Sequence, residues 1–305
     1  MRFALTDEQR GFADSLDDML RRADTVAVAR AWAAGDHQPG RDLWRRLADQ
    51  GVCALVVPEE AGGLGGTEVD LVVAHEALGH HLAVGPWIES TAYLATVLAG
   101  DAAEQLAGGA MATLALPPLA PYALDADAAD MVHLGDREAS AGERVVSLDT
   151  TRRLFRVTDS GQVEADPVAL DRAVLAASAQ LLGAGERLLA DSVGYVKQRT
   201  QFGRPIGSYQ AVKHRLADVR IALDFARPLV YAAALGEVPT SAAKVSTGDA
   251  AYLAARVGLQ VHGAIGYTAE FDLGLWVNRV RALLGAWGGS DHHRARLGEH
   301  LTGAR

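Results

Sequence analysis

The chain has 305 residues, 49% hydrophobic and 22% charged, a composition ordinary for a globular protein with an extensive core or several subdomains. Its net charge of −9 argues against a nucleic-acid partner, which needs a basic surface, and no stretch approaches the roughly 18 apolar residues of a membrane span. A single cysteine, Cys53, excludes an internal disulfide, and no basic segment followed by an apolar run opens the chain. We therefore expect a cytoplasmic protein.

Residues 1–109 have the pattern of an N-terminal helical domain. Thr6 and Gln9 fit a capping box, and the apolar stripe after them predicts a first helix. The other elements predicted here are helices at 43–50, 69–79 and 86–109, a short buried strand or extended segment at 52–57, and a glycine-rich loop at 59–66.

Residues 110–165 have a different sequence pattern, because short apolar runs replace the apolar stripes at helical spacing. The runs lie at 111–116, 131–134, 144–148 and 154–157, and prolines and glycines separate them. This pattern predicts a small domain of a few antiparallel strands.

Residues 166–305 return to helical spacing after a hinge at Asp166-Pro167. Helices are predicted at 168–198, 208–235, 240–262 and 288–301. Long antiparallel helices of this kind pack as a bundle and commonly form an oligomer interface. The predicted fold class is therefore mainly α with a small middle β domain and a C-terminal four-helix bundle.

The turn between the first two of these helices is dense in groups that can hold a phosphate-bearing ligand. Gly203 and Gly207 separate the helices, which leaves Arg199, Gln201 and Phe202 at a helix end. An arginine fork clamps phosphate at two points, and an aromatic face carries a heterocycle. Spacing alone equally allows a surface helix hairpin with a solvated basic turn.

Three stretches carry a resemblance to a known family. They are RTQFGRPIGSYQAVKHRLADV at 199–219, VVPEEAGGLGGTEVDLVVAHEALG at 56–79 and QVHGAIGYT at 260–268. They resemble motifs of the flavin-dependent acyl-CoA dehydrogenases, which oxidise acyl-CoA thioesters with FAD and pass electrons to an electron-transfer flavoprotein. The resemblance covers the N-terminal and C-terminal thirds and fails in the middle.

The resemblance implies a set of FAD-binding residues at the subunit interface. In the family, the residues that match Arg199, Gln201 and Phe202 contact the pyrophosphate and adenine half of a neighbouring subunit's FAD, and Gln210 lies on the same surface. Gln260 and Gly263 match a glycine-rich turn that seats the same group. Where the family has a further glycine this chain has Ala264, which crowds the approach of the backbone.

The middle domain departs from the family pattern. Members that hold their own flavin carry a Thr-Glu-Pro loop ending in Gly-Ser-Asp and a later Trp-Ile or Trp-Thr pair, and neither motif is found here. The domain is also about half the usual size. A self-sufficient flavin pocket is therefore not expected.

The catalytic base is displaced as well. Many members of the family carry Tyr-Glu-Gly-Thr where this chain has GAWGGS at 285–290. In those members the glutamate removes the α proton of the thioester. The position of this glutamate falls at Trp287 here, and tryptophan cannot accept a proton. A minority place the base on the first long C-terminal helix, and Asp171 matches that position. Asp171 is one methylene shorter than glutamate, and its alternative role is a charge favoured at a helix N-terminus.

The remaining polar candidates are interpreted as structural. His262 is expected to be a turn residue. Adjacent helical side chains diverge by about 100° and do not easily share a metal ion, which applies to His292-His293 and to His80-His81, so no metal site is predicted. A solvated surface is expected for His292-His293. The candidates for contacts with CoA phosphates are Lys197, Arg204 and Lys244.

Three hypotheses follow for the function. The chain is a catalytic subunit whose base is Asp171, a non-catalytic scaffold that completes a partner's FAD site, or a helical interaction protein without flavin. The expected partner is a homologous full-length acyl-CoA dehydrogenase subunit, because some bacterial members of the family are α2β2 heterotetramers with one shortened chain; a homo-oligomer is the alternative. The acyl group of the thioester is not specified by the sequence.

Overall fold

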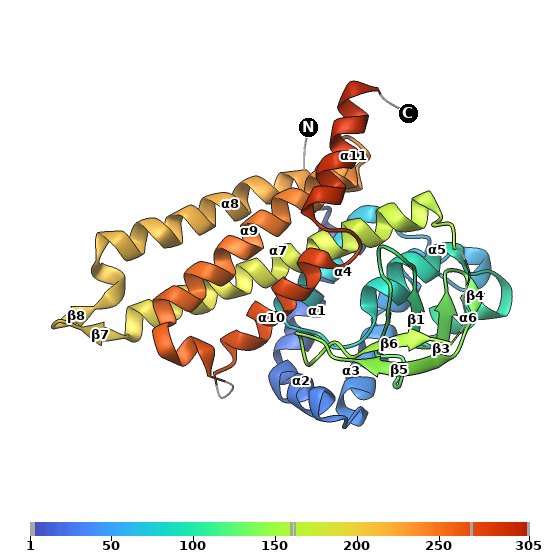
Figure 1. Cartoon of the computed structure of the whole chain (residues 1–305), viewed down its shortest axis with the longest axis horizontal. Helices are drawn as coiled ribbons and strands as arrows, with labels where there is room; N and C mark the ends of the chain where they lie inside the picture. Colours follow the sequence, from blue (N-terminus) through green and yellow to red (C-terminus); the bar gives the residue numbers. More distant parts are fainter. Residues whose placement is uncertain (1–3, 159–160, 162, 269–270, 304–305) are drawn as a thin grey trace.

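In the computed structural model, which describes residues 4–158, 161, 163–268 and 271–303, helices occupy both ends of the chain and short strands lie between them (Figure 1). The helices of the N-terminal part are α1 (Asp7–Arg21), α2 (Thr25–Ala34), α3 (Gln38–Asp49), α4 (Glu68–His80), a π-helical segment (Glu89–Leu94), α5 (Ala95–Val97) and α6 (Gly100–Ala107). The C-terminal helices are α7 (Pro167–Gln198), α8 (Gln210–Ala234), α9 (Thr240–His262), α10 (Leu273–Gly285) and α11 (Ser290–Thr302). No helix in the described ranges combines the length and apolarity that a membrane span requires.

The strands form two small three-stranded sheets and one protruding hairpin. The strands are β1 (Ala112–Ala115), β2 (Ala123–Leu124), β3 (Met131–Leu134), β4 (Arg137–Glu138), β5 (Ala141–Val145), β6 (Leu154–Val157), β7 (Thr200–Gln201) and β8 (Arg204–Pro205). The first sheet has the order β1-β3-β4 and the second β2-β6-β5. The prediction that all pairs are antiparallel is wrong for β1 and β3, which are parallel. The long connection between them makes this possible, because parallel neighbours need a crossover.

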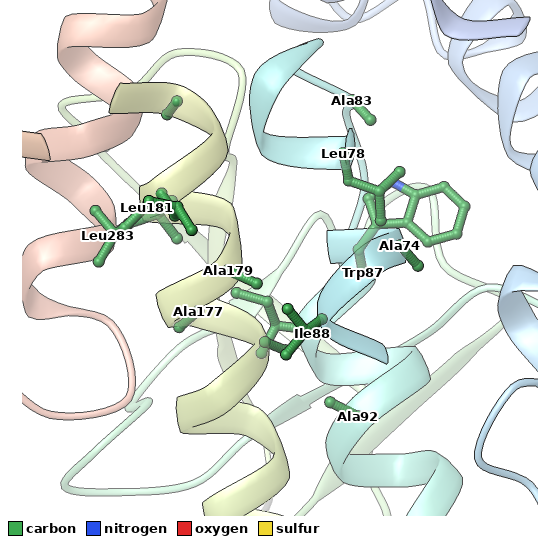
Figure 2. Packing of buried hydrophobic residues seen from close by; sticks show 14 of the residues in the cluster. Ala74, Leu78, Ala83, Trp87, Ile88, Ala92, Ala177, Ala179, Leu181 and Leu283 are labelled. Carbon is green, nitrogen blue, oxygen red and sulfur yellow. The ribbon is translucent and has the colours of Figure 1, made fainter. Parts of the chain in front are cut away.

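Helix α7 is the central element of the fold and packs against α4, α8, α9 and α10 (Figure 1). Its residues from Ala173 to Gly185 are all buried, so this part is covered on every side rather than along one stripe. Asp166 caps its N-terminus by accepting hydrogen bonds from the amides of Val168 and Ala169. Figure 2 shows the apolar layer around this helix, formed by side chains that include Leu78, Trp87, Ile88, Ala177 and Leu181.

The crossing of α4 and α7 depends on two glycines. A Cβ atom on Gly79 would lie 2.2 Å from the carbonyl oxygen of Gln180, and one on Gly183 would lie 2.0 Å from the carbonyl oxygen of Glu76. Real atoms do not approach so closely, so the two backbones meet only because both side chains are absent.

We expect Gly183→Ala to lower the free energy of unfolding by about 1–3 kcal/mol, because the added methyl must push α4 away. A Cβ atom on Gly194, which lies on the same helix, would have nothing within 4 Å. Gly194→Ala is the matched control and should be neutral or stabilising by about 0.5–1 kcal/mol, since alanine is the better helix former. Urea denaturation measures both, and equal effects of the two substitutions would contradict the close crossing.

Several predicted elements differ from the structure. Residues 52–57 form no strand, and Val52–Ala54 is a 3-10 turn buried under α3. The predicted helix at 86–109 begins as the π-helical segment and is broken at Leu98, which has extended backbone angles (φ −77°, ψ 147°). The C-terminal part has five helices among the described residues instead of four, because α10 is not among the predicted elements.

Candidate functional site

The hairpin after α7 presents the predicted phosphate-binding residues to solvent. Arg199 caps the C-terminus of α7, and the short strands β7 and β8 project from the end of the helical part (Figure 1). Phe202 occupies the tip with a left-handed backbone (φ 52°), and 92% of its surface is exposed. Within the described residues, neither the Arg199 guanidinium nor the Gln201 amide makes a hydrogen bond. Such a side-chain set is available to a ligand or a partner.

The second predicted segment lies at the same end of the molecule. Helix α9 ends at His262, whose ring centroid lies 4.2 Å from that of Tyr195 in the last turn of α7. Gly263 follows with φ 64° and ψ −139°, angles that only glycine adopts readily. His262 itself is buried as the last residue of α9, and its Nδ1 lies 2.8 Å from the Gly258 carbonyl oxygen of the same helix. The predicted residues Gln210, Gln260, Gly263 and Ala264 are all exposed.

Trp287 is fixed inside the protein, in the loop between α10 and α11. Its side chain is fully buried and stacks on Tyr93 with ring centroids 5.5 Å apart. His293 Nε2 donates to the Trp287 carbonyl oxygen at 3.0 Å, and the buried Lys244 ammonium donates to the carbonyls of Leu283 and Gly288. These bonds hold the loop in a single position. Burial lowers the pKa of Lys244 to about 8.

Trp287 borders a cavity of about 300 Å³ between the β region and α10. Two buried charged residues that sequence reasoning missed also line it: Glu89, from the π-helical segment, and Arg152, just before β6. Arg152 Nη2 lies 3.9 Å from Glu89 Oε1. Burial raises the pKa of the Glu89 carboxyl group, and the charge of Arg152 partly opposes this. The sequence feature that could have indicated Glu89 is its position as the one charged residue in the otherwise uncharged run PWIESTAYL at 86–94.

Asp171 lies on the first turns of α7, in a different cleft. Its Oδ1 accepts hydrogen bonds from the Thr240 hydroxyl at 2.8 Å and from Arg296 Nη2 at 2.9 Å. The cleft has a volume of about 720 Å³, and none of the residues that line it lines the cavity at Trp287. The two candidate positions for a base are therefore not brought into one pocket.

The expectation of a solvated surface for His292-His293 is wrong for His293, and His81 of the other pair is buried as well. His293 is fully buried and its Nδ1 lies 3.0 Å from the Ser241 hydroxyl, while His81 is 6% exposed and bonds to Asp17 Oδ1. Both point inward because an adjacent polar partner satisfies the ring. Lys244, a candidate for contacts with CoA phosphates, is buried as well. In the part of the chain that the structure describes, no cluster of His, Cys, Asp or Glu could hold a metal ion.

Comparisons with known proteins match both helical regions. The family model described as "Acyl-CoA dehydrogenase, C-terminal domain" matches residues 167–302, and the one described as "Acyl-CoA dehydrogenase, N-terminal domain" matches residues 6–113. A relative from Mycobacterium tuberculosis named acyl-CoA dehydrogenase IpdE2 is 36% identical over 292 residues, covering 90% of this chain and 91% of its own.

Solved structures share the fold. Butyryl-CoA dehydrogenase from Megasphaera elsdenii superposes with a TM-score of 0.82 at 20% identity, covering 99% of this chain and 100% of its own. A chain of the ChsE4-ChsE5 complex from Mycobacterium tuberculosis superposes with a TM-score of 0.81 at 23% identity and full coverage of both chains.

Proposed function

Because this chain belongs to the acyl-CoA dehydrogenase family, we propose that it is a subunit of an FAD-dependent acyl-CoA dehydrogenase that completes the flavin site of a full-length partner subunit. The observation that carries the proposal is the exposed hairpin with Arg199, Gln201 and Phe202. An exposed phenylalanine beside an arginine that has no partner among the described residues is matched to a heterocycle joined to phosphate. The roles of these residues are expectations carried from the family motif.

The ADP half of FAD fits this end of the chain. The Arg199 fork would hold the pyrophosphate and the Phe202 ring would face the adenine, while Gln210, Gln260, Gly263 and Ala264 would form the surrounding surface. Glycine at 263 lets the backbone turn with its amide groups accessible to an anion.

The flavin-ring half of FAD does not fit the cavity at Trp287. Trp287 stands where many family members have the glutamate base and stacks on Tyr93, and the volume of about 300 Å³ beside it is at the lower limit for a small-molecule pocket. A tricyclic ring system together with an acyl thioester needs more space than this. We therefore propose that the partner holds the flavin ring.

The proposed reaction is α,β-dehydrogenation of an acyl-CoA thioester, and FAD, when bound, accepts the hydride from the β carbon. This chain contributes binding and orientation of the cofactor's far end. We propose an electron-transfer flavoprotein as the acceptor of the electrons. The heteromeric arrangement is proposed by analogy with the ChsE4-ChsE5 complex, one chain of which shares this fold.

Replacement of Asp171 separates a catalytic from a scaffolding role. We expect Asp171→Asn to change turnover of the co-expressed complex by less than about twofold, because Asp171 is engaged by Arg296 and Thr240 and the partner supplies the base. The amide keeps a carbonyl oxygen for both donors. A fall of about a hundredfold or more, the usual size for loss of general-base catalysis, would instead make Asp171 the base.

A further inference from the structure

One aromatic cluster joins the two segments that are proposed to contact FAD. Arg199 lies at the end of α7 and Gly263 at the end of α9. The His262 ring packs between two other rings, with its centroid 4.2 Å from that of Tyr195 and 5.1 Å from that of Phe271. The centroids of Tyr195 and Phe271 are 6.3 Å apart. Aromatic rings at such separations attract one another, so the three rings form one packed group.

The rings of this cluster are connected directly to the residues that would hold the ligand. Tyr195 lies one helical turn before Arg199, and its carbonyl oxygen accepts a hydrogen bond from the Arg199 amide at 2.9 Å. His262 directly precedes Gly263, and the turn at 263–267 packs back onto it: a Cβ atom on Gly266 would lie 3.1 Å from the His262 Cβ atom. The separation between the end of α7 and this turn is therefore set by the His262 ring.

The His262 ring acts through its shape, because neither of its nitrogens bonds to the neighbouring segments. The side chain is buried, so it does not face a ligand. Its Nδ1 donates to the Gly258 carbonyl oxygen within α9, and its Nε2 has no hydrogen-bond partner among the described residues. The contacts that reach α7 and the segment before α10 are ring contacts only. A different aromatic ring of similar size should therefore serve equally well.

We propose that His262 is a positioning residue: its ring holds the end of α7 and the turn at 263–267 at the separation that lets Arg199 and Gly263 contact one ADP group together. The inference rests on the proposed function and adds to it a residue that does not touch the cofactor. A site whose two halves are already in place binds more tightly, because less ordering is required on binding. Loss of the ring should therefore weaken FAD binding although every proposed contact residue is still present.

The test is titration of FAD into the flavin-depleted complex of this chain with the proposed full-length partner subunit. We expect His262→Ala to raise the dissociation constant of FAD about tenfold, because two aromatic contacts are lost. His262→Phe keeps the ring and removes the unpaired nitrogen, so its dissociation constant should stay within about twofold of the unaltered complex. If His262→Ala does not assemble, His262→Leu, which keeps most of the buried volume without an aromatic ring, should weaken FAD binding several-fold.

The matched control is His81→Ala, which removes another buried histidine. His81 bonds to Asp17 of α1, so its loss should lower the free energy of unfolding but leave the affinity for FAD unchanged. Equal weakening of FAD binding by His81→Ala and His262→Ala would show a general loss of stability and would overturn the proposal.

A double-mutant cycle with Arg199 separates this inference from the proposed function. If His262 acts by positioning Arg199, His262→Ala should raise the dissociation constant by less than about threefold in a chain that already carries Arg199→Ala. The positioning role alone is overturned if Arg199→Ala weakens FAD binding while His262→Ala does not, if the effects of the two substitutions are independent, or if His262→Phe fails to restore the affinity. If neither Arg199→Ala nor His262→Ala changes the affinity, the proposed function falls together with the inference.

Discussion

An Arg199→Ala variant, co-expressed with the proposed full-length partner subunit, should hold FAD about ten- to a hundredfold more weakly than the unaltered complex. The range corresponds to the loss of charge-assisted hydrogen bonds to a phosphate, about 1.5–3 kcal/mol. Removal of the side chain should not disturb the fold, because the Arg199 guanidinium is exposed and makes no hydrogen bond or ion pair with the described residues. Titration of FAD into the flavin-depleted complex measures the dissociation constant.

The matched control is Arg22→Ala, which removes an exposed arginine at the other end of the chain, where its side chain is 77% exposed. It should leave FAD affinity unchanged. If Arg199→Ala also leaves FAD affinity unchanged, the hairpin does not contact the cofactor, and the hypothesis of a helical interaction protein without flavin gains support.

Arg279→Met should lower the free energy of unfolding by about 3–5 kcal/mol, the cost of leaving one charge of a buried pair without its partner. Arg279 on α10 donates to Asp149 Oδ2 at 2.7 Å, to the Thr151 hydroxyl at 2.8 Å and to the Ala83 carbonyl at 3.2 Å. Both members of the pair are almost fully buried, at 3% and 1% side-chain exposure. The Arg279–Asp149 ion pair therefore links the β region to the C-terminal helices.

Two further variants make the result specific. Arg281→Met, at an exposed position two residues along the same helix, should cost less than about 1 kcal/mol, as is usual for surface charges. The double variant Arg279→Met/Asp149→Leu should recover part of the loss, since no buried charge is left unpaired. Denaturant unfolding monitored by tryptophan fluorescence compares all three. A decrease in the free energy of unfolding below about 1 kcal/mol for Arg279→Met would contradict a stabilising link between the two regions.

The long C-terminal helices could be predicted closely because their apolar spacing and end signals agree. Asp166-Pro167 starts α7, as the predicted hinge indicates, and the capping box at Thr6 and Gln9 is present. The strands β1, β3 and β6 coincide with the apolar runs found in the sequence. The direction of β1 relative to β3 could not be predicted, because it depends on where the connection between them packs.

The buried polar residues of the site could not be predicted from sequence patterns. Glu89 and Arg152 are 63 positions apart, and only the packing of the β region against the π-helical segment brings them into one cavity. The polar sequence around His293 suggests a surface histidine. Its ring is buried instead, because both ring nitrogens have partners: the Ser241 hydroxyl and the Trp287 carbonyl oxygen. By contrast, the substitution of Trp287 for a base depends only on alignment of one short motif, and the structure adds that this tryptophan is buried.

The central claim is that this chain supplies contacts to a flavin that it cannot retain alone. The most direct measurement is the visible absorption spectrum of the chain purified alone and of the chain co-expressed with the proposed full-length partner, with flavin quantified after denaturation. We expect a colourless isolated chain and a complex with one flavin per heterodimer. A stoichiometric flavin band in the isolated chain would contradict the account and would indicate a homo-oligomeric dehydrogenase.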